Sequence, residues 1–344
     1  MGDEQRSARD EAADGPVPAG APHPAGRPAT SGAGPDPAEA TEPGPALPPE
    51  HGSPEAEPAA APFAAGRVKV VSEPAGAPDD EYRWHTGLNR PTGLPDAVEF
   101  IEVHKAFGRN KVLRGLNLGL PEGKISMILG PSGTGKSVCI KHMVGLLYPD
   151  DGDVLVHGES VPAMRDEELF AMRKKFGVLF QDGALFGSMN LYDNVAFPLR
   201  QHTDKGEEEI GEIVHRRLAE VGLGDAGDKL PNELSGGMRK RAGFARALVL
   251  DPDIVLFDEP DSGLDPVRTA LLCELIQEIH EENGGAYTVI THDIMSARRV
   301  AEYIAVLWLG KVVEAGPAEE LFNSENAFVR QFLSGAARGP LGME

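Results

Sequence analysis

Cysteine and long hydrophobic runs are both scarce in this sequence of 344 residues. The two cysteines, Cys139 and Cys273, are too few and too isolated for a disulfide framework or a zinc site. The longest apolar runs, such as residues 304–309, fall far short of the roughly 20 residues that a membrane-spanning helix needs. We therefore expect a protein of the reducing cytoplasm that reaches a membrane only through a partner.

Basic residues are also in deficit, with 33 Lys and Arg against 54 Asp and Glu and a formal net charge of -21. A protein that binds nucleic acid in general needs a basic face to attract phosphates, so we expect no nucleic-acid partner. The opening stretch MGDEQRSARDEAADGP is polar and acidic. It lacks the basic and then apolar pattern of a signal peptide, and none is predicted.

Residues 1–96 differ in composition from the rest of the chain. They hold 18 of the 29 prolines and carry 16 acidic against 7 basic residues. Such a segment buries too little apolar surface to offset the entropy of ordering it. We predict a disordered Pro-, Ala- and Gly-rich acidic tail over residues 1–96. An inert tail, or a start codon assigned too early, is favoured over a regulatory role, for which the sequence offers no motif.

From residue 97 onward, short apolar runs alternate with helical stretches. The runs AVEFIEVHKAF, KISMILG, GDVLVHG, FGVLFQ, DIVLFDEP and YTVITHD are predicted to be strands. Helical segments such as PVRTALLCELIQEIHEEN separate them, which indicates an α/β core with a largely parallel sheet. The stretch from about residue 182 to 243 is predicted to be a helical insertion between two core strands. No internal repeat is visible, so the chain carries one such domain.

The sequence GPSGTGKS fits the pattern G-x-x-x-x-G-K-[ST] of a phosphate-binding loop, between a predicted buried strand and a helix. Its glycines let backbone N–H groups turn towards a β-phosphate, and the helix N-terminus adds partial positive charge. We predict that Lys136 contacts the β- and γ-phosphates of ATP and that Ser137 is a ligand of Mg²⁺. The predicted loop comprises Gly130, Pro131, Ser132, Gly133, Thr134, Gly135, Lys136 and Ser137. The strand and helix that flank it argue against an ordinary Gly-rich turn.

Two adjacent carboxylates, Asp258 and Glu259, end the predicted strand DIVLFDEP. A carboxylate in this position is costly to desolvate unless it is paired or lies near a metal. Since successive side chains of a strand point in opposite directions, the two residues can have different tasks. We predict that Asp258 binds Mg²⁺, directly or through water, and that Glu259 polarises the attacking water. An ordinary strand end is the alternative, and the preceding phosphate loop argues against it.

With LSGGM at residues 234–238, the chain resembles the ATP-binding cassette family, whose signature motif begins a helix in a helical subdomain. The resemblance covers about residues 98–320. It implies a P-loop NTPase cassette at residues 97–322, with a RecA-like core, the helical subdomain and an N-terminal antiparallel β region. It also implies that Ser235, Gly236 and Gly237 contact the γ-phosphate bound by the opposite subunit of a homodimer. Met238 stands where Gln is common, and it cannot donate a hydrogen bond.

The other motifs of the family follow in the family's order. Phe107 matches the aromatic residue that stacks on adenine, with an ordinary core phenylalanine as the alternative. Gln181 matches the glutamine that senses magnesium and water, Asp265 the loop that crosses the dimer interface, and His292 the histidine that contacts the γ-phosphate. The resemblance thus implies an ATPase with the catalytic residues Glu259, His292, Gln181 and Lys136, and with Ser137, Gln181 and Asp258 at the magnesium ion.

FQDGALF at 180–186, NLYDNVAFPL at 190–199, the Met-ended signature and the C-terminal VRQFLSGAARGPLGM resemble the actinobacterial and other ATPases of Mla- and Mce-type lipid transporters. The resemblance implies a peripheral homodimer at the cytoplasmic face of the cell membrane. It would serve a YrbE/MlaE-like permease and Mce-type proteins that handle a lipid or sterol. The alternatives are a soluble cassette ATPase for repair, translation or iron–sulfur assembly, and a non-catalytic nucleotide-dependent module. The single cassette without coiled coil or zinc module disfavours the first, and the complete catalytic set disfavours the second.

Residues 323–344 are predicted to form a C-terminal helix and tail. Within them, AFVRQFL places Phe328, Phe332 and Leu333 on one helical face. Packing of this helix on its own domain and contact of the tail with the partner subunit are the two alternatives.

Overall fold

The computed structural model describes residues 69–70 and 82–341 of the chain. Most of the predicted tail therefore lies outside the described residues. Within the described part, packing begins before the predicted boundary at residue 97. His85 is buried and its Nε2 atom donates to the carbonyl oxygen of Trp308 across 2.8 Å. Strand β2 (Leu88–Asn89) pairs in parallel with β12 (Lys311–Pro317), because the edge of β12 offers unpaired backbone groups.

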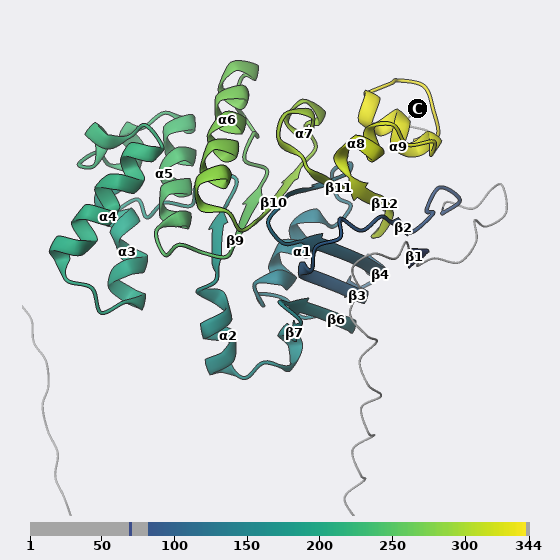
Figure 1. Cartoon of the computed structure of the whole chain (residues 1–344), viewed down its shortest axis with the longest axis horizontal. Coiled ribbons are helices and arrows are strands. Elements are labelled where there is room, and N and C mark those ends of the chain that lie inside the picture. Colours follow the sequence, from purple (N-terminus) through teal and green to yellow (C-terminus); the bar gives the residue numbers. More distant parts are fainter. Residues whose placement is uncertain (1–68, 71–81, 342–344) are drawn as a thin grey trace, which may run out of the picture. The chain divides into compact units, whose positions relative to one another are not determined.

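The central sheet has the strand order β1-β2-β12-β11-β5-β10-β9-β8 (Figure 1). Strands β11, β5, β10, β9 and β8 run parallel, which confirms the predicted α/β core. Every residue of β5 and β10 is buried, as expected for parallel strands that are covered on both faces. The bounds are β1 Lys69–Val70, β5 Ile125–Leu129, β8 Phe176–Leu179, β9 Ile254–Asp258, β10 Ala286–Thr291 and β11 Tyr303–Trp308.

A second, antiparallel sheet has the order β4-β3-β6-β7, which confirms the predicted antiparallel region. Its strands are β3 Asp96–Phe107, β4 Asn110–Pro121, β6 Asp151–Val156 and β7 Glu159–Ser160. Strand β4 was not among the predicted strands. It contains Gly115 and Gly119, and a Cβ atom on Gly119 would lie 2.2 Å from a carboxylate oxygen of Asp96. The glycine that weakens the strand signal is thus needed for close packing.

Three helices, α3 (Leu191–His202), α4 (Glu207–Glu220) and α5 (Gly236–Leu248), form the helical subdomain and lie together in Figure 1. Helix α5 continues past residue 243, so this subdomain ends later than predicted. The other helices are α1 Lys136–Met143, α2 Asp166–Arg173, α6 Pro266–Asn283, α7 Ile294–Val300, α8 Ala318–Phe322 and α9 Ala327–Ser334, with short 3-10 turns at Val161–Ala163, Gly224–Ala226 and Pro231–Glu233. Among the described helices, none has the length and apolarity to cross a membrane.

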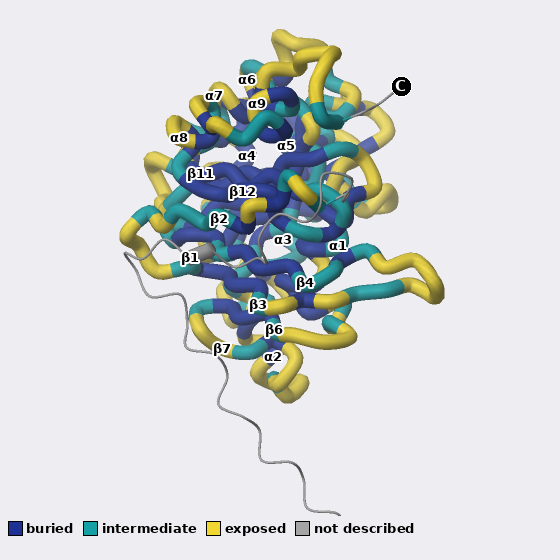
Figure 2. The backbone as a smooth tube through the Cα atoms, turned by 90° about the vertical axis from the view of Figure 1, so that its right-hand side faces the viewer, coloured by how far each residue is buried: buried dark blue, intermediate teal, exposed yellow. Residues whose placement is uncertain are grey.

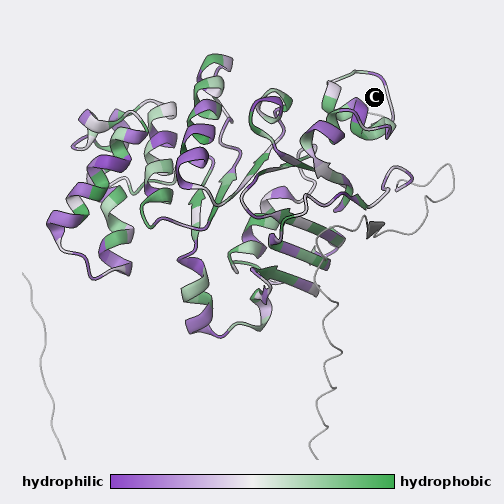
Figure 3. Cartoon of the chain, viewed as in Figure 1, coloured by the Kyte–Doolittle hydropathy of each residue, from purple (hydrophilic) through white to green (hydrophobic). Residues whose placement is uncertain are grey.

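The two faces of the central sheet bury different side chains. Met127 and Leu129 of β5 belong to the core that also includes residues of α3 to α7 and α9, whereas Ile128 belongs to the core that includes residues of β3, β4 and α1. This alternation places one hydrophobic core on each side of the sheet. Figure 2 shows buried backbone concentrated along the strands, and Figure 3 shows helices such as α4 with a mixture of hydrophilic and hydrophobic residues.

Helix α9 packs on its own chain. Phe328 is 1% exposed, and its ring centroid lies 5.5 Å from that of Trp308. Leu333 is buried, and its carbonyl oxygen accepts a hydrogen bond from Arg298 across 3.2 Å. These contacts favour packing on the same domain, and a contact between the tail and a second subunit stays a prediction.

Candidate active site

The phosphate loop connects β5 to α1 by a tight turn that needs its glycines. A Cβ atom on Gly130 would lie 2.2 Å from the carbonyl oxygen of Leu307, and Gly135 has a left-handed φ of 102°. Gly135 precedes the first residue of α1, and no side chain of the described residues caps this helix. The first N–H groups of α1 thus face the loop without a side-chain acceptor, an arrangement that suits an anion.

Lys136, the first residue of α1, is buried inside the loop. Its ammonium donates to the carbonyl oxygens of Gly130 and Pro131 across 2.8 and 2.9 Å. Burial lowers the pKa of Lys136, and the nearby charges of Glu259 and Asp258 oppose this shift. Both hydrogen-bond acceptors are neutral, so an anionic phosphate is a stronger partner for the same ammonium.

Ser137 and Asp258 meet between α1 and the end of β9. The Ser137 hydroxyl donates to Oδ1 of Asp258 across 2.9 Å. Burial raises the pKa of Asp258, Glu259 adds to this effect, and the hydrogen bond from Ser137 opposes it. A hydroxyl and a carboxylate oxygen are the hard donors that Mg²⁺ prefers, so these residues fit a magnesium ion.

Glu259 and His292 come together where β9 and β10 end. The Glu259 N–H donates to the carbonyl oxygen of Ile290 across 2.8 Å, which ties the two strand ends. Glu259 has a left-handed φ of 48°, an uncommon conformation outside glycine. Its Oε1 atom lies 3.7 Å from Nδ1 of His292. The structure thus places the predicted water-polarising carboxylate beside the predicted γ-phosphate contact.

Phe107 ends one other strand, and Gln181 lies just beyond the end of a second. Gln181, just beyond the end of β8, donates from Nε2 to the Ser262 hydroxyl across 3.1 Å. Phe107 ends β3 and is 49% exposed, with the ammonium of Lys105 at 5.9 Å from its ring centroid. The alternative of a core phenylalanine is therefore wrong, and stacking of Phe107 on adenine stays a prediction.

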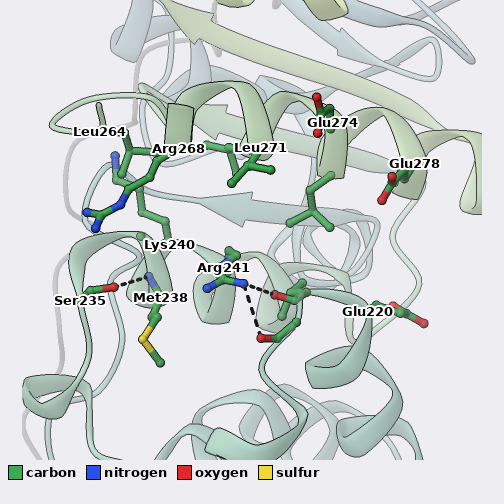
Figure 4. A pocket seen from close by; sticks show the side chains of 15 residues that line it. Glu220, Ser235, Met238, Lys240, Arg241, Leu264, Arg268, Leu271, Glu274 and Glu278 are labelled. Carbon is green, nitrogen blue, oxygen red and sulfur yellow. Dashed lines mark hydrogen bonds between the residues drawn. The ribbon is translucent and has the colours of Figure 1, made fainter. Parts of the chain in front are cut away.

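The signature residues begin α5. Ser235 precedes this helix, and its hydroxyl accepts a hydrogen bond from the N–H of Met238 across 3.3 Å. Ser235 and Met238 line a cavity of about 440 Å³. Figure 4 shows them across from Leu264 and Arg268. The residues of the phosphate loop do not line this cavity. The signature therefore presents its polar turn to a space other than the chain's own phosphate loop.

Asp265 forms the N-terminal cap of α6 within the same region. Its Oδ1 atom accepts hydrogen bonds from the N–H groups of Val267 and Arg268 across 3.1 and 3.0 Å. This carboxylate is therefore already used to order the loop, and its contact with a second subunit stays a prediction.

Comparison with known proteins identifies the family. A family model described as ABC transporter matches residues 113–262. The probable ribonucleotide transport ATP-binding protein mkl of Mycobacterium leprae is 52% identical over 253 residues, which cover 74% of this chain and 72% of that protein. The chain belongs to the ABC transporter family. It is the ATP-binding subunit of such a transporter and an ATPase.

Other relatives of this ABC protein agree with the assignment. The intermembrane phospholipid transport system ATP-binding protein MlaF of Escherichia coli K12 is 40% identical over 248 residues, covering 72% of this chain and 92% of MlaF. The structure of CbiO1 from Clostridium perfringens matches with a TM-score of 0.62 and 28% identity, covering 67% of this chain and 92% of that one. The dimeric cassette MJ0796 bound to ADP and Pi matches with a TM-score of 0.60 and 31% identity, covering 64% of this chain and 98% of that one.

Sequence reasoning missed the residue that orders the loop after Gln181. Asn194 on α3 is fully buried, and its Oδ1 atom accepts from the N–H of Phe186 across 2.8 Å. Its Nδ2 atom lies within hydrogen-bond distance of the carbonyl oxygens of Phe186, Met189 and Asn190. The available signal was a polar residue on a face of α3 that is otherwise apolar.

Lys240 and Asp261 were also missed. Lys240 lies on the buried row of α5 that Phe244 and Leu248 continue, which places a cation at a core position. Asp261 follows the paired carboxylates and is 8% exposed. The helical spacing of Lys240 was the available signal, since a lysine in such a row must have partners.

Proposed function

We propose that this ABC ATPase powers an Mla/Mce-type lipid transporter as a homodimer at the cytoplasmic face of the cell membrane. Its partners would be a YrbE/MlaE-like permease and Mce-type proteins. The match to MlaF, whose name describes intermembrane phospholipid transport, supports this proposal because it spans 92% of that protein. The cargo class of this chain is inferred from that likeness.

The proposed hydrolytic step begins with ATP at the phosphate loop. Lys136 leaves the carbonyl oxygens of Gly130 and Pro131 and pairs with the phosphates. Ser137, Asp258 and Gln181 would hold Mg²⁺, which supplies positive charge to the phosphate oxygens. Glu259 orients and polarises the attacking water, and His292 stabilises the γ-phosphate as charge develops. The distance of 3.7 Å between Glu259 and His292 supports their joint action.

The proposed site is completed by a second copy of the chain. Ser235, Gly236 and Gly237 would cover the γ-phosphate held by the opposite subunit, while Asp265 lies at the interface. Phe107 would stack on adenine. The position of the signature away from the chain's own phosphate loop supports this arrangement, as does the dimeric form named for MJ0796. Phosphate release would then weaken the interface and drive opening of the dimer.

The proposed contact with the permease lies on the loop that follows Gln181. The two stretches that resemble lipid-transporter ATPases, 180–186 and 190–199, form a single hydrogen-bonded unit around Asn194. This unit leaves Phe186 44% exposed, with the guanidinium of Arg246 at 5.7 Å from its ring centroid. Arg246 also donates to the carbonyl oxygens of Gly183 and Ala184. An exposed aromatic residue on a well-ordered loop is a suitable contact for a permease.

The test is a pull-down of the tagged chain from detergent-solubilised native membranes, followed by mass spectrometry. Recovery of a YrbE/MlaE-like permease with Mce-type proteins supports the proposal. Phe186→Ser should reduce this recovery, whereas Leu94→Ser, at a residue with 41% exposure, serves as a control and should not. Recovery of another permease would contradict the branch, and recovery with ribosomes, DNA or assembly factors would contradict the partnership itself.

The name of the mycobacterial relative points to a different cargo, ribonucleotides. The two cargoes can be separated once the complex is purified and reconstituted. We expect phospholipid in the membrane, and not added ribonucleotides other than ATP, to stimulate ATP hydrolysis by the complex. Stimulation of ATP hydrolysis by ribonucleotides, and not by phospholipid, would favour ribonucleotides as the cargo.

A further inference from the structure

We propose that Lys240 and Asp261 are positioning residues that join the signature helix α5 to Glu259 and His292 through residues 260–262. This inference rests on the proposed roles of Glu259 and His292 in hydrolysis. It assigns a task to two buried charged residues that the catalytic scheme above does not use.

Lys240 approaches the segment from the signature helix. Its ammonium is buried and donates to the carbonyl oxygens of Pro260, across 2.7 Å, and of Ser262. These two carbonyl groups lie on either side of Asp261 in the chain. A buried ammonium is costly unless it is hydrogen-bonded, so the contact fixes both the lysine and the segment. A movement of α5 is thereby transmitted to the backbone around Asp261.

Asp261 approaches His292 from the other side of the segment. Its Oδ2 atom accepts a hydrogen bond from the Thr291 hydroxyl across 2.6 Å. The same atom lies 3.1 Å from the Ser296 hydroxyl, whose single proton is shared with Oδ2 of Asp293 at 2.8 Å. Thr291 directly precedes His292, and its hydroxyl oxygen also accepts from the N–H of Asp293 across 3.0 Å. The carboxylate therefore holds the side chain of Thr291, which in turn holds the backbone N–H of Asp293 on the other side of His292.

Ser262, the last residue of this segment, contacts the remaining catalytic groups. The N–H of Ser262 donates to the carbonyl oxygen of Glu259 across 3.1 Å, and the Ser262 hydroxyl accepts from Gln181. Residues 260–262 thus connect the signature helix, the water-polarising carboxylate, the glutamine and the histidine. Because these contacts lie within one short turn, a shift of α5 should change the distance between Glu259 and His292.

Electrostatics supports a tight coupling between Lys240 and the site. Burial lowers the pKa of Lys240, and the charges of Asp261, Asp182 and Glu259 oppose this shift. The Oδ1 atom of Asp261 is buried and has no hydrogen-bond partner within the part of the chain that the structure describes. Removal of the charge of Lys240 or of Asp261 would leave the other charge buried with less compensation. The effects of the two substitutions on kcat should therefore not be additive.

The first test uses Asp261→Asn in the purified full chain. Asparagine keeps the shape of the side chain but replaces one acceptor oxygen with a donor. We expect kcat for ATP hydrolysis to fall by about 10- to 100-fold, and the Kd for ATP to change by less than about two-fold, because the phosphate loop is untouched. Lys240→Met should behave alike, and Lys240→Arg, which retains donors, should recover part of kcat. Asp166→Asn, at an exposed residue of α2, is the matched control.

The second test places Asp261→Asn in a His292→Ala background and measures residual turnover by release of radiolabelled phosphate. If Asp261 acts through His292, the added substitution should change kcat by less than about two-fold. A further loss of about two-fold or more would show that Asp261 does not act through His292 and would overturn its role as the residue that positions this histidine. Normal kcat of Asp261→Asn in the wild-type background would overturn it as well.

Two controls keep these outcomes apart. If Asp261→Asn lowers the melting temperature sharply, Thr291→Val removes the shorter hydrogen bond to the carboxylate and keeps both charges, and it should give a smaller loss of kcat. Normal kcat of Thr291→Val would contradict the inference. If Glu259→Gln and His292→Ala both hydrolyse ATP normally, the proposed catalytic roles fail. If these two variants lose activity while Asp261→Asn does not, the catalytic roles stand and only the positioning role of Lys240 and Asp261 fails.

Discussion

The Ser137 hydroxyl donates a hydrogen bond to the Asp258 carboxylate across 2.9 Å, although the two residues lie 121 positions apart in the chain. Ser137 lies on α1, which follows β5, and Asp258 ends β9; these two strands are separated in the sheet by β10. Since parallel strands place their carboxyl ends at the same edge, the phosphate loop and the paired carboxylates converge there. The topology of the sheet thus assembles the nucleotide site from two motifs that are far apart in the sequence.

Substitution of Lys136 tests the nucleotide site. We expect Lys136→Ala to weaken ATP binding by about 100-fold or more, because it removes the ammonium that the loop buries for a phosphate. Binding can be measured by titration with a fluorescent ATP analogue. Lys174→Ala, at an exposed residue, should leave affinity unchanged. Undiminished affinity of Lys136→Ala would count against the assignment of the loop.

Substitution of Glu259 separates binding from hydrolysis. Glu259→Gln should bind ATP normally and lose about 10²- to 10³-fold in kcat, since the amide cannot accept a proton from water. The variant should accumulate as an ATP-bound dimer, which light scattering after size-exclusion chromatography can detect. Glu282 is exposed, and Glu282→Gln should hydrolyse ATP normally and should not accumulate as an ATP-bound dimer. Normal turnover of Glu259→Gln would remove Glu259 from its proposed role.

Asp96 predicts a dependence of stability on pH. Burial, together with the charges of Glu99 and Glu122, raises the pKa of Asp96 from 3.8 to about 7. Between about pH 4 and pH 7 the unfolded chain releases this proton while the folded chain keeps it. The contribution of Asp96 to the free energy of unfolding is therefore intact below about pH 4 and declines as the pH rises to about 7.

We expect Asp96→Asn to be more stable than the wild type at pH 8 by about 1–2 kcal/mol, a value reduced by the partial exposure of this carboxyl. The difference should shrink towards pH 4. Urea unfolding of both proteins from pH 4.5 to pH 8 measures it. A difference that stays constant over this range would contradict the raised pKa of Asp96.

The sequence predicted the parts of the molecule whose signals are local. The phosphate loop, the paired carboxylates and the buried strands each lie within a few consecutive residues, and helix α6 was predicted at its observed bounds. The exposure of Phe107 was left open, because an aromatic residue at a strand end has the same local pattern in a core and at a ligand site. Only the fold decides between these two.

Contacts over long sequence distances were not predictable in the same way. His85 and Trp308 are 223 positions apart, and the segment around His85 has the proline-rich, acidic composition of a tail. Its packing depends on the free edge of β12, which composition does not encode. Likewise, the partners of Lys240 belong to a turn that meets α5 only after the sheet and the helical subdomain have assembled.

The C-terminal helix allows a test with a matched pair of phenylalanines. Phe328 is 1% exposed and packs beside Trp308, whereas Phe332, one turn later on α9, is partly buried. Phe328→Ala should lower the free energy of unfolding by about 3–5 kcal/mol, because it leaves a cavity in the core. We expect Phe332→Ala to lower the free energy of unfolding by about 1 kcal/mol, because Phe332 buries less apolar area. Urea unfolding of the two variants measures both values.

The dependence of stability on protein concentration then distinguishes packing of α9 on its own domain from packing on a partner subunit. Since the contacts of Phe328 lie within one chain, the loss of stability should be the same at low and high protein concentration. If the helix instead packed on a partner subunit, the loss would grow with concentration as dimers form. Equal stability of Phe328→Ala and the wild type at low concentration would contradict packing of α9 on its own domain.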